Sequence, residues 1–220
     1  DATFKRLEES EEIIGGAMEM WRTKCCTDSG NEIKISIEAL SQFPKSDFFM
    51  LFFLRKNGFK EIRISAVSDL LKANAGTQLI SDSHRLIRDR DFLFLIDKKK
   101  SGTINPEEAF SFVLETSVGE IPDEQWTAVI DSSSVNLPFT VRSWKAGDKM
   151  IPFGMSGHRN VSDILNELKL PLHKKEKAAV VLSGNEIVWI PGYRIAEKFR
   201  VTKNTSSTLR LFFNPDSYGK

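Results

Sequence analysis

The sequence has few cysteines, and the two that it has are adjacent. Cys25 and Cys26 are the only cysteines in 220 residues, and no cluster of histidines lies near them. A zinc site draws its ligands from spaced positions, and a disulfide framework needs several cysteines. The sequence therefore predicts neither a metal site nor a disulfide framework. The lack of disulfides is typical of a reducing cytoplasm, where we expect this protein to act.

Long apolar runs are also missing. The longest is FFMLFFL, residues 48–54, whereas a helix that spans a bilayer needs about 20 apolar residues. We expect this run to form a buried core helix, and we expect no contact with a membrane. The chain begins at Asp1 without a signal-peptide pattern, which favours an excised piece of a longer protein.

Motifs for catalysis are absent as well. The sequence contains no G-x-x-x-x-G-K-[ST] or G-x-G-x-x-G loop for phosphates and no G-x-S-x-G nucleophile turn. The three histidines, His84, His158 and His173, are far apart, and each lies beside a basic residue. A histidine in such a place is more often a surface contact than a general base. The sequence predicts no catalytic residue and leaves binding as the function.

The chain does have enough apolar sequence to bury a core, since 40% of its residues are hydrophobic and 28% are charged. Apolar residues recur at helical spacing from Phe4 to Cys25, and a second helix is expected with Ser46 as its N-cap and Gly58 as its stop. After Gly76, short strand-like runs separated by turn residues replace the helices.

We therefore expect an α+β fold, with an N-terminal helical domain and a mixed α+β C-terminal domain. The expected boundaries are 1–75 for the helical domain, 76–138 for a strand-rich connecting region and 139–220 for the basic C-terminal domain.

Two local patterns stand out in the C-terminal part. AAVVLSGNEIVWI, residues 178–190, is the clearest hairpin, with Ser183, Gly184 and Asn185 as its turn. Upstream of it, SDILNEL predicts a short helix capped by Asn160 or Ser162.

The net charge of +1 is unevenly divided along the chain. Residues 1–139 hold 17 basic and 23 acidic side chains, whereas residues 140–220 hold 14 and 7. A basic C-terminal part favours contact with an anionic partner. A basic face that only keeps the chain soluble agrees equally well with the charge alone.

The most unusual stretch is RSWKAGDKMIPFGMSGHRNVSD, residues 142–163, which combines three glycines with basic and aromatic side chains. Glycines let a backbone approach a partner closely, and lysine and arginine neutralise phosphates. Trp144, Phe153 and Tyr193 are candidates for stacking on exposed bases, although burial in a core is the more common role of aromatic side chains. The alternative for the whole stretch is a tight corner in which Asp148 caps a turn. The two interpretations are compatible.

A longer pattern around this stretch resembles a known family. VRSWKAGDKMIPFGMSGHRNVSDILNELKLP, followed by AVVLSGNEIVWIPGYRIAEKFRVT, is similar to the C-terminal domain of tRNA(Ile)-lysidine synthetases. The similarity covers about residues 139–204 and rests on R-x-W-K-x-G-D-x-M-x-P-F-G-M, on the basic pair after Gly157 and on I-V-W-I-x-G-x-R-I with F-x-V-T. The segments FFLRKNGF and SHRLIRDRD look like the part that follows the catalytic domain in that family.

The resemblance implies a role in an ATP-dependent ligase reaction. The family joins lysine to the wobble cytidine of an isoleucine tRNA with a CAU anticodon, using ATP and magnesium, in an N-terminal adenylating domain that carries a Ser-Gly-Gly-x-Asp-Ser loop. This sequence lacks that loop, so the resemblance implies a part that grips and positions tRNA without catalysis or a cofactor of its own. The residues that it implies as tRNA contacts are Arg142, Lys145, Lys149, His158, Arg159, Arg194 and Lys198.

One departure from the family pattern weakens a predicted contact. Many members have two lysines where this chain has His158 and Arg159. Arginine still binds phosphate, but histidine is a weaker cation than lysine near neutral pH, so we expect a weaker contact at position 158.

A second hypothesis is a structural or self-association module without direct RNA contact. FFMLFFL is suited to a dimer interface as well as to a core, and this hypothesis predicts a homodimer.

Overall fold

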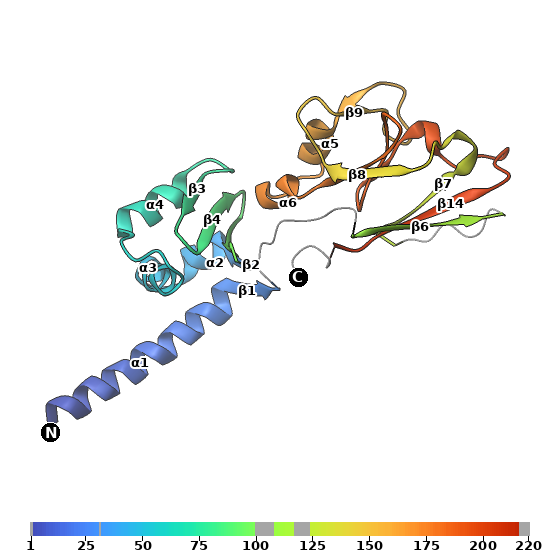
Figure 1. The fold of residues 1–220 in the computed structure, drawn as a ribbon. Helices are drawn as coiled ribbons and strands as arrows, with labels where there is room; N and C mark the ends of the chain where they lie inside the picture. Colours follow the sequence, from blue (N-terminus) through green and yellow to red (C-terminus); the bar gives the residue numbers. More distant parts are fainter. Residues whose placement is uncertain (1, 31, 100–107, 117–123, 216–220) are drawn as a thin grey trace. The chain divides into compact units, whose positions relative to one another are not determined.

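The computed structural model describes residues 2–30, 32–99, 108–116 and 124–215. The chain divides into two compact units, residues 1–101 and 102–220 (Figure 1). Both units combine helices with antiparallel sheets, which confirms the expected α+β class. Among the described residues, no helix has both the length and the apolar character needed to cross a membrane.

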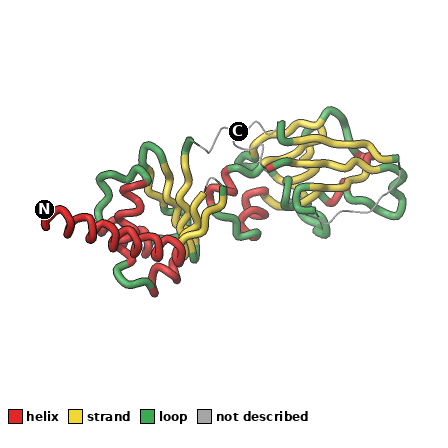
Figure 2. Tube along the Cα trace, turned by 90° about the horizontal axis from the view of Figure 1, so that it is seen from below, coloured by secondary structure: helices red, strands yellow, loops and turns green. Residues whose placement is uncertain are grey.

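The first unit packs helices against a five-stranded antiparallel sheet with the strand order β1-β2-β5-β4-β3. Figure 2 shows its helices in red and its strands in yellow. The core joins Trp21, Met50 and Leu54 from the helices to Leu86 and Leu93 from the sheet. Its elements are α1 (Ala2–Cys25), β1 (Cys26–Ser29), β2 (Glu32–Ser36), α2 (Ile37–Gln42), α3 (Ser46–Lys56), α4 (Ile64–Lys72), β3 (Gln78–Ile80), β4 (His84–Asp89) and β5 (Phe92–Asp97).

The start of α3 differs from the sequence prediction by one residue. The helix begins at Ser46, and its N-cap is Lys45, which has a φ of 56°. The Ser46 hydroxyl accepts a hydrogen bond of 3.0 Å from the indole N–H of Trp21. The prediction of Ser46 as the cap was wrong because this buried indole, 25 residues earlier in the chain, uses the hydroxyl instead.

The end of α3 is as predicted. Gly58 has a φ of +87°, its N–H donates to the carbonyl of Arg55, and the N–H of Phe59 donates to the carbonyl of Leu54. This pair of bonds closes a helix at a left-handed residue. A Cβ atom at Gly58 would lie 2.2 Å from the Ser83 hydroxyl, so any other residue there would force the Ser83 side chain to move.

The second unit contains a four-stranded sheet, β13-β12-β11-β8, and a three-stranded sheet, β6-β14-β7. Their core joins Ile130 and Leu211 to Val181, Trp189 and, from α5, Leu165. Its elements are β6 (Phe110–Glu115), β7 (Thr127–Asp131), η1 (Ser132–Ser134), β8 (Phe139–Ser143), β9 (Lys149–Met150), β10 (Arg159–Asn160), α5 (Val161–Glu167), α6 (Leu172–Glu176), β11 (Ala179–Ser183), β12 (Glu186–Ile190), β13 (Arg194–Ile195), η2 (Glu197–Phe199) and β14 (Thr208–Phe213).

Two local predictions for this unit are confirmed. β11 and β12 form the expected antiparallel hairpin, with Ser183 opposite Glu186. Asn160 is the N-cap of α5, although its side-chain amide donates to the Asp163 carboxylate at 2.9 Å instead of accepting from the backbone.

The segment 76–138, expected as one connecting region, contributes strands to both units. β3, β4 and β5 complete the first sheet, whereas β6 and β7 belong to the second unit. The acidic and basic residues are therefore distributed differently between the two units than between residues 1–139 and 140–220. The first unit has 17 basic and 16 acidic residues, and the second has 14 of each. The basic character of residues 140–220 is thus a local property within a neutral unit, and the three-domain division stays a prediction.

Candidate nucleic-acid interface

The unusual stretch folds as a corner followed by a short hairpin. β8 leads into the corner, and β9 and β10 then pair in antiparallel fashion, with Met150 opposite Arg159 and Lys149 opposite Asn160. Residues 151–158 form the loop between these two strands. The chain enters α5 directly after β10.

Asp148 holds the corner together. Its carboxylate accepts two hydrogen bonds from the Arg142 guanidinium, at 2.8 and 2.9 Å, and one from the backbone N–H of Lys145 at 2.8 Å. The carbonyl of Asp148 accepts from the N–H of Val161, which ties the corner to α5. The prediction that Asp148 caps a turn is therefore confirmed.

The ion pair in this corner is largely shielded from solvent. The Arg142 side chain is 27% exposed and that of Asp148 is 14% exposed. The hydrogen bonds from Arg142 lower the pKa of Asp148, with a further contribution from the Lys145 N–H. The hydrogen bonds to Asp148 raise the pKa of Arg142 in turn. The charge of Arg142 is thus already neutralised within the protein.

Two more of the predicted contact residues are in ion pairs. Arg159 pairs with Glu167, and Lys198 pairs with Glu186. Both pairs are at the surface, where an ion pair contributes little free energy. A phosphate group can therefore compete with Glu167 for Arg159 and with Glu186 for Lys198.

The other four predicted contact residues are exposed; three of them are cations and the fourth is a histidine. Within the described part of the chain, no ion pair involves Lys145, Lys149, His158 or Arg194. All four side chains are exposed. Arg194 lies in β13, next to Ile195, whose carbonyl accepts a hydrogen bond from Phe153 in the hairpin loop. The fold thus places Arg194 beside the hairpin although it is about 40 residues away in sequence.

The three aromatic candidates differ in their surroundings. Trp144 is half-buried, and its indole N–H donates to the carbonyl of Lys175 at 2.6 Å. Tyr193 packs edge-on against Trp126, and burial raises the pKa of its hydroxyl. Phe153 is 55% exposed. Trp144 and Tyr193 therefore have structural roles, and Phe153 alone among the three is available to a partner.

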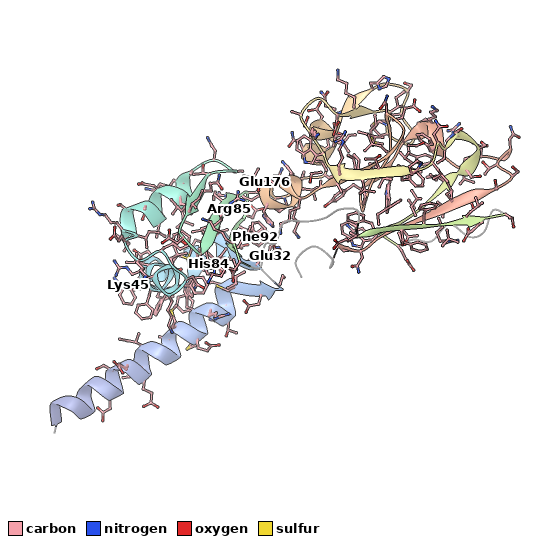
Figure 3. All side chains as sticks on the ribbon, viewed as in Figure 1. Glu32, Lys45, His84, Arg85, Phe92 and Glu176 are labelled. Atoms are coloured by element: carbon pink, nitrogen blue, oxygen red, sulfur yellow. The ribbon has the colours of Figure 1, made fainter. Side chains whose placement is uncertain are left out.

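The histidines lie in three different settings. His84 is at the start of β4 in the first unit, beside Arg85 (Figure 3), and its Nδ1 atom lies 2.9 Å from the Ser83 hydroxyl. His158 is exposed in the hairpin loop, and His173 is buried in α6. In the described ranges, no group of three His, Cys, Asp or Glu side chains is placed to hold a metal ion.

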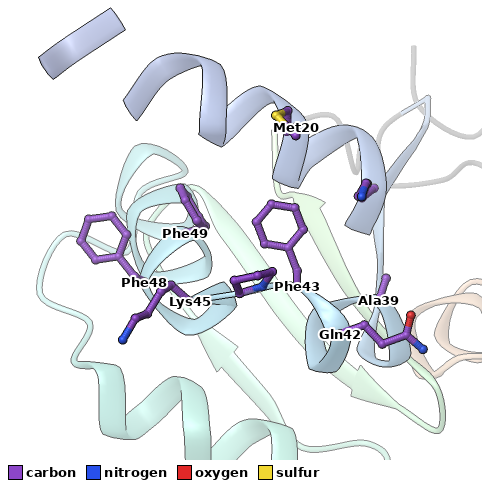
Figure 4. A pocket seen from close by; sticks show the side chains of 9 residues that line it. Met20, Ala39, Gln42, Phe43, Lys45, Phe48 and Phe49 are labelled. Atoms are coloured by element: carbon purple, nitrogen blue, oxygen red, sulfur yellow. The ribbon is translucent and has the colours of Figure 1, made fainter. Parts of the chain in front are cut away.

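The first unit carries an apolar groove that the sequence did not predict. The groove has a volume of about 850 Å³ and lies between α1, α2 and α3 (Figure 4). Its walls include Met20, Phe43, Phe48 and Phe49. FFMLFFL is apolar on every side of a helix, and only part of it is covered. Met50, Phe53 and Leu54 are buried, whereas Phe48 is 49% exposed and Phe52 is 44% exposed. The expectation of a core helix therefore holds for one face of α3.

Comparison with known proteins assigns both units. Residues 28–99 match the family model described as the TilS substrate binding domain, and residues 139–211 match the TilS substrate C-terminal domain. The chain belongs to the TilS family. The groove of the first unit lies partly within the first TilS match, and the corner, the hairpin and Arg194 all lie within the second.

Relatives with curated names agree with the TilS assignment. A tRNA(Ile)-lysidine synthase of Parabacteroides distasonis is 31% identical over 193 residues, which are 82% of this chain and 44% of the relative. The enzyme of the same name from Bacteroides thetaiotaomicron is 30% identical over 215 residues, 94% of this chain and 48% of the relative. The chain thus spans about half the length of the curated TilS relatives that it matches. A crystal structure of a TilS C-terminal domain is 20% identical, with a TM-score of 0.43, and covers 52% of this chain and 90% of that one.

Proposed function

We propose that this chain is the tRNA-binding part of a tRNA(Ile)-lysidine synthase and that it grips and positions the tRNA for a reaction carried out elsewhere in the protein. The observation that carries the proposal is the match of both units to the substrate domains of one family. The exposed cations around the hairpin, Lys145, Lys149 and Arg194, supply the charge that phosphates require.

The wider activity follows from the same proposal. The ligand is an isoleucine tRNA with a CAU anticodon, the full protein is an ATP-dependent ligase that adds lysine to the wobble cytidine, and it acts in the cytoplasm. ATP and Mg²⁺ belong to the catalytic part. The described residues offer no cluster of metal ligands, so no step through Mg²⁺ is assigned to this chain. We expect the chain alone to show no lysine-dependent consumption of ATP, and such consumption would contradict the proposed division of labour.

The test is the salt dependence of tRNA binding. Each phosphate that a protein cation neutralises contributes about −0.7 to −0.9 to the slope of log K against log salt concentration. The double variant Lys145→Ala/Lys149→Ala should therefore bind isoleucine tRNA more weakly, with a slope shallower by about 1.5. Filter binding or fluorescence anisotropy over a salt series measures both quantities.

Lys203→Ala is the matched control, because it removes an exposed lysine of the same unit outside the corner and the hairpin. Its slope should stay close to that of the unmodified chain. A chain that does not bind tRNA, or that binds with no salt slope, would overturn the proposal. Arg142→Ala is a poor probe, because it breaks the corner as well as removing a charge.

The groove of the first unit favours self-association as a second candidate function. Phe48 and Met20 line it and are both exposed, and exposed apolar grooves are typical of protein interfaces. On this hypothesis the chain forms a homodimer, and Phe48→Asp converts it to a monomer in sedimentation equilibrium. Ile64→Asp, which places the same charge on the exposed side of α4, should leave the dimer intact. A strict monomer at high concentration would exclude this function.

A further inference from the structure

The tip of the β9–β10 hairpin is fixed from several sides. The backbone N–H of Phe153 donates to the carbonyl of Ile195 at 2.9 Å, and that of Met155 donates to the carbonyl of Pro152 at 3.0 Å. The N–H of Gly154, where φ is +81°, donates to the carboxylate of Glu197 at 2.8 Å. The loop is thus tied to β13 and η2 by hydrogen bonds within the protein.

This fixed loop directs two large apolar side chains into solvent. Phe153 is 55% exposed and Met155 is 43% exposed, whereas Pro152 beside them is buried. Because the backbone of this loop is already held in place, less conformational entropy is lost when a partner covers it, and its exposed ring is suited to binding.

The charges around the ring indicate the kind of partner. Lys149 and His158 lie at the two ends of the loop, and Arg194 neighbours the residue whose carbonyl holds Phe153 in place. An apolar protein surface does not match this set of exposed cations. An unpaired nucleotide does, because its base offers a flat face for stacking and its phosphates offer charge. A base inside a duplex is covered on both faces and offers no such surface.

The glycine at position 157 leaves room for a close approach from outside. Its φ lies outside the left-handed region, and a Cβ atom there would have no neighbour within 4 Å. Neither the backbone conformation nor the packing of the described residues therefore requires glycine at this position. The missing side chain leaves the backbone of this loop open to close approach by a partner.

We propose that Phe153, flanked by Met155, is a stacking platform for one unpaired base of the bound RNA, with Lys149 and Arg194 on the adjacent phosphates. This inference rests on the proposed tRNA-binding function and adds to it a contact with a base face. The platform takes a base from a single-stranded segment, and a tRNA has such segments at its 3′ end and in its loops.

The test separates stacking from charge. Loss of a base–aromatic stack weakens binding by roughly 5- to 150-fold and leaves the number of phosphate contacts unchanged. Phe153→Ala should therefore weaken binding of tRNA, and of a short unstructured RNA, at every salt concentration without changing the salt slope. Phe153→Trp should restore affinity, and Phe153→Leu, which keeps apolar area without an aromatic face, should not. Lys149→Ala differs from Phe153→Ala in the salt slope, which should become shallower because a phosphate contact is lost.

Three further measurements decide the remaining alternatives. Equal thermal melting of Phe153→Ala and the unmodified chain excludes misfolding as the cause of weaker binding. A tRNA shortened by its single-stranded 3′ end distinguishes the 3′ end from the loops, because the effect of Phe153→Ala disappears with the shortened tRNA only if the base comes from the 3′ end. Gly157→Val should weaken RNA binding with no loss of stability.

The same binding measurements distinguish a wrong stacking platform from a wrong tRNA-binding function. If the unmodified chain binds tRNA with a salt slope and Phe153→Ala binds equally well, the platform is wrong and the tRNA-binding function stands. If Phe153→Ala loses as much affinity for a blunt RNA duplex as for single-stranded RNA, stacking on an unpaired base is wrong. If the unmodified chain binds no RNA, both are wrong.

Discussion

At the scale of single residues, side chains of the same charge in one short stretch have different roles because of their partners. Arg142 and Lys145 are three residues apart and were predicted alike as tRNA contacts. Asp148 binds the guanidinium of Arg142 in two places, but it binds only the backbone N–H of Lys145. The Arg142 side chain is therefore part of the corner, and the Lys145 side chain remains exposed. The sequence contains all three residues, but their pairing depends on a backbone turn that spacing alone does not define.

The corner predicts a stability effect at Asp148. Asp148→Asn removes the charge that Arg142 faces in a largely shielded site, so we expect the free energy of unfolding to fall by about 1–3 kcal/mol in urea titrations. Glu167→Gln breaks the exposed pair with Arg159 and should change it by less than about 1 kcal/mol. Equal effects of the two substitutions would contradict a structural role for the Arg142–Asp148 pair.

The same pair predicts a pH dependence. Because folding lowers the pKa of Asp148, its contribution to stability is complete above the ordinary aspartate pKa of about 3.9. That contribution is lost as the pH falls through the lowered value in the folded state. Asp148→Asn should therefore lose less stability than the unmodified chain on acidification below about pH 4. If the two proteins lose stability equally as the pH falls below about 4, the Arg142–Asp148 pair does not contribute to the pH dependence.

At the scale of elements, the sequence defined those whose signals are local. The β11–β12 hairpin and the end of α3 at Gly58 rest on a few neighbouring residues, and both are confirmed. The cap of α3 was mistaken because Trp21, which binds Ser46, comes from another helix. The candidate site shows the same limit, because Arg194 reaches the hairpin through the pairing of Phe153 with Ile195. Contacts between distant elements are not encoded in local patterns.

Two glycines with a left-handed backbone, Gly58 after α3 and Gly76 in the turn before β3, test this local logic. Gly58 and Gly76 both have a positive φ, but a Cβ atom at Gly58 would meet the Ser83 hydroxyl, and one at Gly76 would meet nothing within 4 Å. Gly76→Ala should cost about 1 kcal/mol through backbone strain alone. Gly58→Ala should cost more, and adding Ser83→Ala should recover the difference. If Gly58→Ala and Gly76→Ala are equally destabilised, steric contact with Ser83 has no part in the effect.

At the scale of the whole molecule, the boundary between units changes the meaning of the charge pattern. The sequence suggested an acidic first part and a basic second part, but residues 102–139, with seven acidic and no basic side chains, belong to the second unit. One visible case is Glu115 in β6, which pairs with Arg210 in β14. Phosphate binding is therefore expected at the corner and hairpin of residues 142–159, and the net charge of a unit does not locate it.

The bond between Trp21 and Ser46 also has a practical consequence for spectroscopy. Trp21 is 0% exposed, and it is the only one of the four tryptophans that lies in the first unit; Trp126, Trp144 and Trp189 lie in the second. Its fluorescence is thus a built-in reporter for one unit. The emission difference between the unmodified chain and Trp21→Phe isolates the melting of the first unit from that of the second, with no external dye and no need to cut the chain.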